Sequence, residues 1–237
     1  IALLPVADAK QSTVTLKHSN ETARPGYYAL KLDKPEVNVE LTATKRAGFH
    51  RYTFGKGQKA LFRLDLQQGI GWDKLNRCQL RQITPTMITG YRTSVGWAKN
   101  QQVYFTAVFS APVKITNSND TIALLEVANA DKPVLVKVGL SAVNEGNAAL
   151  NLMSEMPGWD FDAVATAASK EWDKELGRVR IETTDATDRT IFYTAMYHSM
   201  IAPSVFSDVN GEYRGSDYKV HRGSFTNYTT FSLWDTY

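Results

Sequence analysis

Cysteine is almost absent from this sequence. Cys78 is the only cysteine among 237 residues, so no disulfide can form within the chain. A single thiol fits a secreted bacterial protein as well as a cytosolic one, so it does not decide the compartment. The neighbours Asn76, Arg77 and Gln79 provide no base that would activate the thiol as a nucleophile. We therefore expect Cys78 to behave as a small buried apolar residue.

Other absences exclude several classes of function. No apolar run approaches the ~18 residues that a membrane-spanning helix needs. The opening residues IALLPVADAK lack the basic region and the apolar length of a signal peptide, which fits a processed or truncated start. Lys and Arg (27) are interspersed with Asp and Glu (24), which argues against a dedicated nucleic-acid surface. The four histidines are not spaced as metal ligands, and neither a metal-binding motif nor a phosphate loop occurs.

Short β-rich segments dominate residues 1–140. Apolar and polar residues alternate strictly over residues 36–41 and again over 134–140, which indicates half-buried antiparallel strands. Five more β-rich runs are GYYALKLD, FHRYTF, KALFRLDL, MITGYRT and QVYFTAVFS. Turn-forming residues separate these runs, so the pattern predicts an antiparallel β-sandwich.

The periodicity changes to that of helices after residue 159. Apolar residues recur every three or four positions from Asp160 to Leu176, and Gly177 follows where a helix ends, so we predict a linker helix there. Trp172 lies on this stripe and is expected in the core, with Trp159 at the junction with the sandwich. A second helix, apolar on most sides, is predicted over 188–202 and ends before Pro203. We expect it to be buried in a helical assembly, with His198 as a hydrogen-bonded core histidine, although little chain remains to cover it.

The last residues, FSLWDTY, contain the strongest candidate site. Ser232 can cap a new helix whose first turn holds Trp234 and Asp235. A carboxylate beside an indole can bind sugar hydroxyls and cover the apolar face of a sugar ring; the alternative is capping and packing of the helix start. Trp72 and Trp97 follow glycines in loops and could also stack on sugars, but core packing is favoured for both.

Five blocks of the sequence together resemble one family. They are KHSNETARPGYYALKL (17–32), VELTATKRAGFHRYTF (39–54), SVGWAKNQQVYFTAVFS (94–110), TIFYTAMYHSMIAPSVFSDVNGEYRG (190–215) and YTTFSLWDTY (228–237). In this order and combination they are similar to family 92 of the glycoside hydrolases, the bacterial calcium-dependent exo-acting α-mannosidases. The resemblance covers most of the chain.

The resemblance implies a fold and a mechanism. It implies an N-terminal β-sandwich over residues 1–150 with its first part missing, a linker with a helix over 151–184, and the start of an (α/α)6 catalytic barrel over 185–237. It also implies hydrolysis of terminal α-linked mannose from glycans with inversion, using a carboxylic acid, a carboxylate base and a calcium ion that holds the mannose hydroxyls.

Only part of the family's site carries over to this sequence. Trp234 and Asp235 would bind the non-reducing mannose through hydrogen bonds and ring contact, without transferring a proton. The loop with Tyr213, Arg214, Gly215 and Asp217 either lines the site or only closes the structure. The acid, the base and the calcium ligands are expected beyond residue 237, so the chain alone should be inactive.

Partners and location follow from the same resemblance. The expected partners are a mannose-capped glycan and the remaining segments of the enzyme, and the expected location is secreted or periplasmic, with surface attachment an option. Two alternatives stay open. One is a non-catalytic carbohydrate-binding or structural sandwich module, and the other is a different sandwich-plus-barrel glycosidase.

Overall fold

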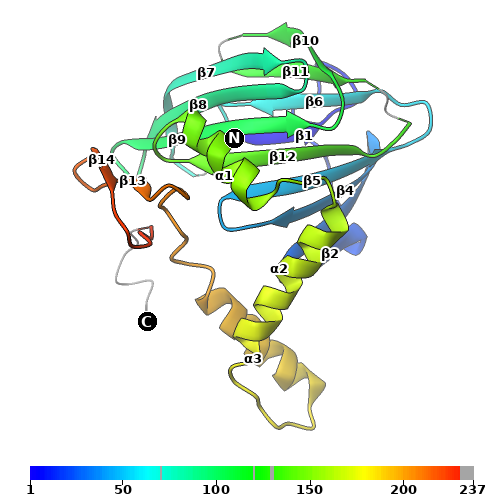
Figure 1. The fold of residues 1–237 in the computed structure, drawn as a ribbon. Helices are drawn as coiled ribbons and strands as arrows, with labels where there is room; N and C mark the ends of the chain where they lie inside the picture. Colours follow the sequence, from blue (N-terminus) through cyan, green and yellow to red (C-terminus); the bar gives the residue numbers. More distant parts are fainter. Residues whose placement is uncertain (70, 120, 129–130, 230–237) are drawn as a thin grey trace.

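Two antiparallel sheets lie face to face in the computed structural model, which describes residues 1–69, 71–119, 121–128 and 131–229 (Figure 1). The larger sheet has the strand order β2-β3-β4-β5-β12-β9-β8-β7. Its strands are β2 (Glu21–Arg24), β3 (Tyr27–Asp33), β4 (Glu36–Ala43), β5 (Ala47–Phe54), β7 (Lys74–Thr84), β8 (Met87–Val95), β9 (Gln101–Phe109) and β12 (Val134–Ser141). The smaller sheet, of order β1-β6-β11-β10, contains β1 (Ala2–Pro5), β6 (Ala60–Asp65), β10 (Val113–Ser118) and β11 (Ile122–Val127).

The core between the sheets is built from the inward positions of these strands. In β4, Val37 and Val39 are buried while Glu36 and Asn38 are exposed, as the alternation predicts. The ring of Tyr52 meets that of Phe62 across the two sheets at 4.8 Å between centroids. The prediction of a β-sandwich is therefore confirmed, and every β-rich run named above overlaps a strand.

Two helices cover the outer face of the larger sheet. They are α1 (Glu145–Glu155), which packs on β12 and β9, and α2 (Phe161–Leu176), which packs on β3, β4 and β5. Phe49, whose side chain is fully buried, lies on this outer face beside Leu152 and Phe161. Gly139 of β12 permits the close approach of α1, because a Cβ atom there would lie 2.1 Å from the carbonyl oxygen of Ala148.

The predicted linker helix is confirmed as α2. Asp160 caps its start by accepting a hydrogen bond from the backbone N–H of Ala163, and Gly177 is its C-cap. Trp159 lies at the junction, 6.1 Å from Phe49 between ring centroids. Trp172 is half-buried rather than in the core, because it contacts Tyr197 of the next helix instead of the sheet.

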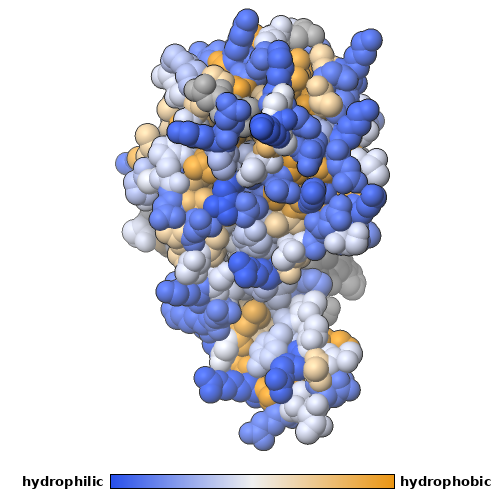
Figure 2. Space-filling view, turned by 90° about the vertical axis from the view of Figure 1, so that its right-hand side faces the viewer, coloured by the Kyte–Doolittle hydropathy of each residue, from blue (hydrophilic) through white to orange (hydrophobic). Residues whose placement is uncertain are grey.

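The second predicted helix is present as α3 (Ala186–Ser199), and it is exposed in the described part of the chain, so its burial in a larger helical assembly stays a prediction. None of its described side chains is buried, and Ile191 is 62% exposed. His198 is exposed rather than a core histidine. The reason is that α3 packs mainly on α2 in the described part of the chain, so its other faces reach the surface. Figure 2 shows apolar side chains at the lower end of the molecule, where these two helices lie. The predicted domain boundaries at residues 150 and 184 stay predictions.

Candidate functional site

After α3 the chain returns to the sandwich and lies across the ends of its strands. We call residues 204–229 the strap (Figure 1). Its two ends run side by side, because Val205 pairs with Tyr228 and the backbone N–H of Thr229 donates to the carbonyl of Ser204 at 2.8 Å. Between them a hairpin forms from β13 (Glu212–Arg214) and β14 (Val220–Arg222).

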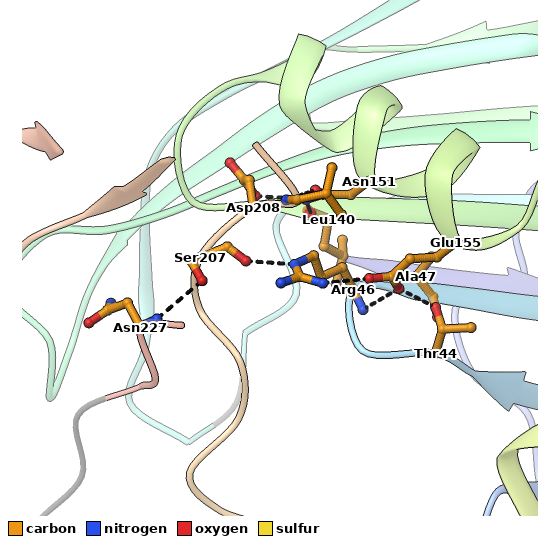
Figure 3. A network of polar contacts seen from close by, with 10 residues as sticks. Thr44, Arg46, Ala47, Leu140, Asn151, Glu155, Ser207, Asp208 and Asn227 are labelled. Atoms are coloured by element: carbon orange, nitrogen blue, oxygen red, sulfur yellow. Dashed lines mark hydrogen bonds and ion pairs between the residues drawn. The ribbon is translucent and has the colours of Figure 1, made fainter. Parts of the chain in front are cut away.

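A buried carboxylate anchors the strap to α1. Asp208 is 4% exposed, and its side chain accepts hydrogen bonds from Ser141 Oγ, Asn147 Nδ2 and Asn151 Nδ2, each at 2.7 Å. Asn151 also accepts a hydrogen bond from the backbone N–H of Val209 at 2.9 Å. Figure 3 shows part of this arrangement, with Asn151 on the helix directed at Asp208 on the strap. Satisfied buried networks of this kind fix one geometry, because every broken bond leaves a desolvated polar group.

A second contact joins the strap to the larger sheet. Arg46 donates from Nε to the carbonyl of Ser207 at 2.6 Å and from Nη1 to Glu155 at 2.7 Å (Figure 3). Glu155 also accepts hydrogen bonds from Thr44 Oγ1 at 2.5 Å and from the Arg46 backbone N–H at 2.9 Å. The end of α1, the turn before β5 and the strap are therefore held together at one point.

The hairpin of the strap is fastened separately. Arg214 donates to the backbone carbonyls of Ala142 and Tyr218, both at 2.8 Å, and of Val143 at 3.3 Å. Hydrogen bonds from Asn147 and Asn210, together with the charge of Arg222, hold the pKa of Glu212 below its usual range despite some desolvation. Glu212 therefore stays ionised and adds a further contact to α1 through Asn147 Nδ2 at 2.8 Å.

The strap and two loops of the sandwich enclose a groove of about 1500 Å³. One loop precedes β7 and the other joins β8 to β9. The groove is lined on the sandwich side by Trp72, Asp73, Arg92, Trp97 and Lys99, and on the strap side by Phe206, Tyr213, Arg214, Asp217, Tyr218, His221 and Tyr228, among others.

The two loop tryptophans are exposed at this groove, so the expectation of core packing was wrong. Trp72 is 72% exposed and Trp97 is 68% exposed. The two loops lie close together at Gly96, where a Cβ atom would come within 3.2 Å of Asp73 Cα and 3.4 Å of Trp72 Cδ1. Neither tryptophan belongs to the two apolar cores, and both line the groove.

A buried ion pair holds the loop that carries Trp72. Arg92, which is 7% exposed, donates from Nε to the carbonyl of Leu66 at 2.9 Å and pairs through Nη1 with Asp73 at 2.6 Å. Desolvation raises the pKa of Asp73, but hydrogen bonds from Ser94 and Arg92 outweigh it and lower that pKa overall. Asp73 therefore stays ionised and keeps the residue next to Trp72 fixed.

On the strap, a histidine and a carboxylate form a polar pair. His221 Nε2 lies 2.9 Å from Asp217 Oδ1 and 3.1 Å from Oδ2. The hydrogen bond from His221, followed by that from the Lys219 backbone, lowers the pKa of Asp217. Tyr218, which follows Asp217 in the sequence, has a φ of 63°, a backbone region that bulky residues rarely adopt. Tyr218 is also 45% exposed. A strained backbone that presents an exposed ring is typical of functional loops.

The structure places the residues predicted from the sequence as follows. Tyr213, Arg214, Gly215 and Asp217 line the groove, while Trp234 and Asp235 lie outside the described residues. Sequence reasoning missed the pairing of His221 with Asp217 and the anchoring role of Asp208. The density of Asn, Asp and Glu in FSDVNGE was the available signal for that anchor.

Two features are absent from the described residues. No group of three or more His, Cys, Asp or Glu side chains there could hold a metal ion. No helix among them has the length and apolarity needed to cross a bilayer.

Two family models match the chain. The model of the glycosyl hydrolase family 92 N-terminal domain matches residues 3–141, and that of the family's catalytic domain matches residues 147–237. A curated relative from Arthroderma benhamiae, described as an uncharacterized secreted glycosidase, is 26% identical over 226 residues; the match covers 79% of this chain and 29% of the relative.

Solved structures of the same family are also similar to this chain. A family GH92 α-mannosidase from Bacteroides thetaiotaomicron has a TM-score of 0.83 and 33% identity, covering 94% of this chain and 33% of its own. The structure of that enzyme in complex with mannoimidazole has a TM-score of 0.86 and 30% identity, covering 99% and 35%. The chain therefore spans about a third of the length of the relatives that it matches.

Proposed function

Because the chain belongs to glycosyl hydrolase family 92, we propose that the intact protein is an exo-acting α-mannosidase. It removes terminal α-linked mannose from glycans with inversion at the anomeric carbon. The described residues form the sandwich and the linker helix, and α3 with the strap begins an (α/α)6 barrel. The observation that carries the proposal is the groove, whose exposed indoles and polar side chains match the apolar face and the hydroxyls of a sugar.

Chain connectivity links this groove to the predicted mannose subsite. Tyr228 and Thr229 line the groove, and Trp234 follows Thr229 by five residues in the sequence. The predicted mannose subsite therefore follows the groove wall directly in the sequence. We assign these two residues to the non-reducing mannose, with the carboxylate accepting hydrogen bonds from its hydroxyls and the indole covering its apolar face.

The proposed reaction is a single displacement. Water attacks the anomeric carbon on the face opposite the leaving group, and the bond from that carbon to the glycosidic oxygen breaks. A carboxylic acid gives its proton to the departing oxygen, and a carboxylate takes a proton from the water. Both groups are expected outside this chain, which alone should not hydrolyse the substrate. The chain's own residues bind and orient the sugar.

Calcium is proposed as the cofactor of the intact enzyme, with its ligands outside this chain. The described residues do not fit the ion, because none of their acidic side chains cluster as ligands. The partners of this chain are then the mannose-capped glycan and the rest of the enzyme. We also propose a secreted or periplasmic location, which is supported by the description of the relative from Arthroderma benhamiae as secreted.

A calcium chelator tests the cofactor and the substrate class together. The intact protein is expected to release mannose from an aryl α-mannoside, and chelation should abolish that release until excess calcium restores it. An aryl α-glucoside serves as the matched control and should not be cleaved. Mannose release that survives thorough chelation would contradict the calcium assignment, while cleavage of neither mannoside nor glucoside would favour a non-catalytic module.

A further inference from the structure

The groove is larger than one sugar requires. Sites for single small ligands measure roughly 300–1,000 Å³, whereas this groove measures about 1500 Å³. Its walls come from two parts of the chain that are far apart in sequence, the sandwich loops and the strap. An elongated ligand that contacts both walls would fill the groove better than a monosaccharide.

Both walls are fixed before any ligand arrives. On the sandwich side, the pair of Arg92 with Asp73 holds the residue beside Trp72. On the strap side, Arg214 ties the hairpin to the carbonyls of Ala142 and Val143. A preorganised site loses less entropy on binding, which is the arrangement expected of a binding groove rather than of two loops that happen to be adjacent.

The chemistry of the walls fits an uncharged sugar. Exposed indoles of Trp72 and Trp97 offer flat apolar surfaces, and the pair of Asp217 with His221 offers both acceptors and a donor for hydroxyl groups. A phosphate or carboxylate ligand would need unpaired cations. Here Arg92 is paired with Asp73 and Arg214 donates to three backbone carbonyls, so among the described lysines and arginines of the lining Lys99 remains to meet an anion. One lysine favours an uncharged ligand over a multiply charged one.

We propose that the groove binds the sugar unit on the leaving-group side of the scissile bond, with Trp97 as the stacking surface and His221 with Asp217 reading its hydroxyls. This inference rests on the proposed function. An exo-acting enzyme holds one terminal mannose in its subsite, so the remainder of the glycan extends only toward the leaving group. Contacts in the groove should then raise kcat/KM for substrates whose leaving group is a sugar, but not for those whose leaving group is a small ion.

Two substrates of the intact protein separate this role from a general effect on activity. In α-linked mannobiose the leaving group is a mannose that would occupy the groove, whereas in α-mannosyl fluoride it is a single ion that cannot. Trp97→Ala is expected to lower the ratio of kcat/KM for mannobiose to kcat/KM for the fluoride by about 10- to 100-fold, the range for loss of one aromatic contact. His221→Ala, on the opposite wall, should lower the same ratio.

Two controls separate loss of the stacking contact from loss of the fold. Trp97→Phe retains an aromatic face and should recover most of the ratio, and the exposure of Trp97 means that its replacement should not change the melting temperature. An unchanged ratio in both alanine variants overturns the proposal. If the wild type cleaves neither substrate, the proposed function fails instead. Calorimetric titration with mannobiose then tests whether the groove binds sugar. Weaker binding by Trp97→Ala supports it, and equal binding overturns it.

Discussion

Replacing Asp208 with alanine should lower the free energy of unfolding by about 3–5 kcal/mol. The substitution leaves the Ser141 hydroxyl and one N–H each of Asn147 and Asn151 without their buried acceptor, and each unsatisfied group costs about 1–3 kcal/mol. The second N–H of each amide keeps its bond, to Glu212 and to the Leu140 carbonyl. Because Asp208 accepts two of the hydrogen bonds that α1 donates to the strap, the loss should appear first as detachment of the strap. Denaturant unfolding of the intact protein gives the total effect, and hydrogen exchange locates it.

The hydrogen-exchange pattern distinguishes this account from general destabilisation. Amides of residues 204–229 should lose protection in Asp208→Ala, while those of β4 and β5 in the sandwich keep it. Asp131→Ala, at an exposed carboxylate, is the matched control and should change neither quantity. Unchanged protection of the strap in Asp208→Ala would show that the buried network does not anchor it.

Replacing Asp235 with asparagine should lower kcat/KM of the intact protein by about a hundredfold. The amide nearly preserves the shape of the side chain but removes the charge, and hydrogen bonds to charged groups contribute about 1.5–3 kcal/mol each. The fold should persist, because asparagine is nearly isosteric with aspartate. Steady-state kinetics on mannobiose measure the effect, and the melting temperature checks the fold.

Asp185→Asn provides the comparison for this variant. Asp185 caps the start of α3 by accepting a hydrogen bond from the Thr187 backbone, away from the groove. The same chemical change there should leave kcat/KM within about twofold, since asparagine is an equivalent cap. Equal kinetics in Asp235→Asn and the wild type would remove Asp235 from the mannose subsite.

Regular patterns in the sequence predicted the fold where one face of an element is apolar. The alternation in β4 and in β12 and the stripe of α2 each correspond to a face that packs on a core. The strand β7 was missed because it is a polar edge strand in which none of its residues is buried. As an edge strand, β7 has a paired strand on one side only and solvent on the other, so its sequence lacks apolar alternation.

The helix α1 was missed for a related reason. Its buried face carries Asn147 and Asn151 as well as Ala148 and Leu152, so the apolar period is interrupted. The two asparagines are buried because they bind Asp208, which lies 61 and 57 residues further along the chain. A partner so distant in sequence leaves no local pattern, so the polar residues of FSDVNGE could mark the anchoring segment but not its partners on α1.

The candidate site was predicted only in part. The motif that ends in Trp234 and Asp235 pointed to a sugar, and the loop with Tyr213 and Asp217 does line a groove. The exposure of Trp72 and Trp97 could not be predicted, because a tryptophan next to glycine suits a core position as well as a binding surface. Whether these tryptophans lie in a core or at a binding surface depends on the strap, residues 204–229, which forms the opposite wall of the groove.

The anomeric form of the first product is the most direct measurement of the central claim. Proton NMR can follow the hydrolysis of an aryl α-mannoside by the intact protein faster than mannose interconverts between its anomers, and this substrate releases a single mannose. Inversion predicts that the β anomer of the newly released mannose appears first and that the α anomer grows later by mutarotation. Initial release of the α anomer, or no release of mannose, would contradict the account.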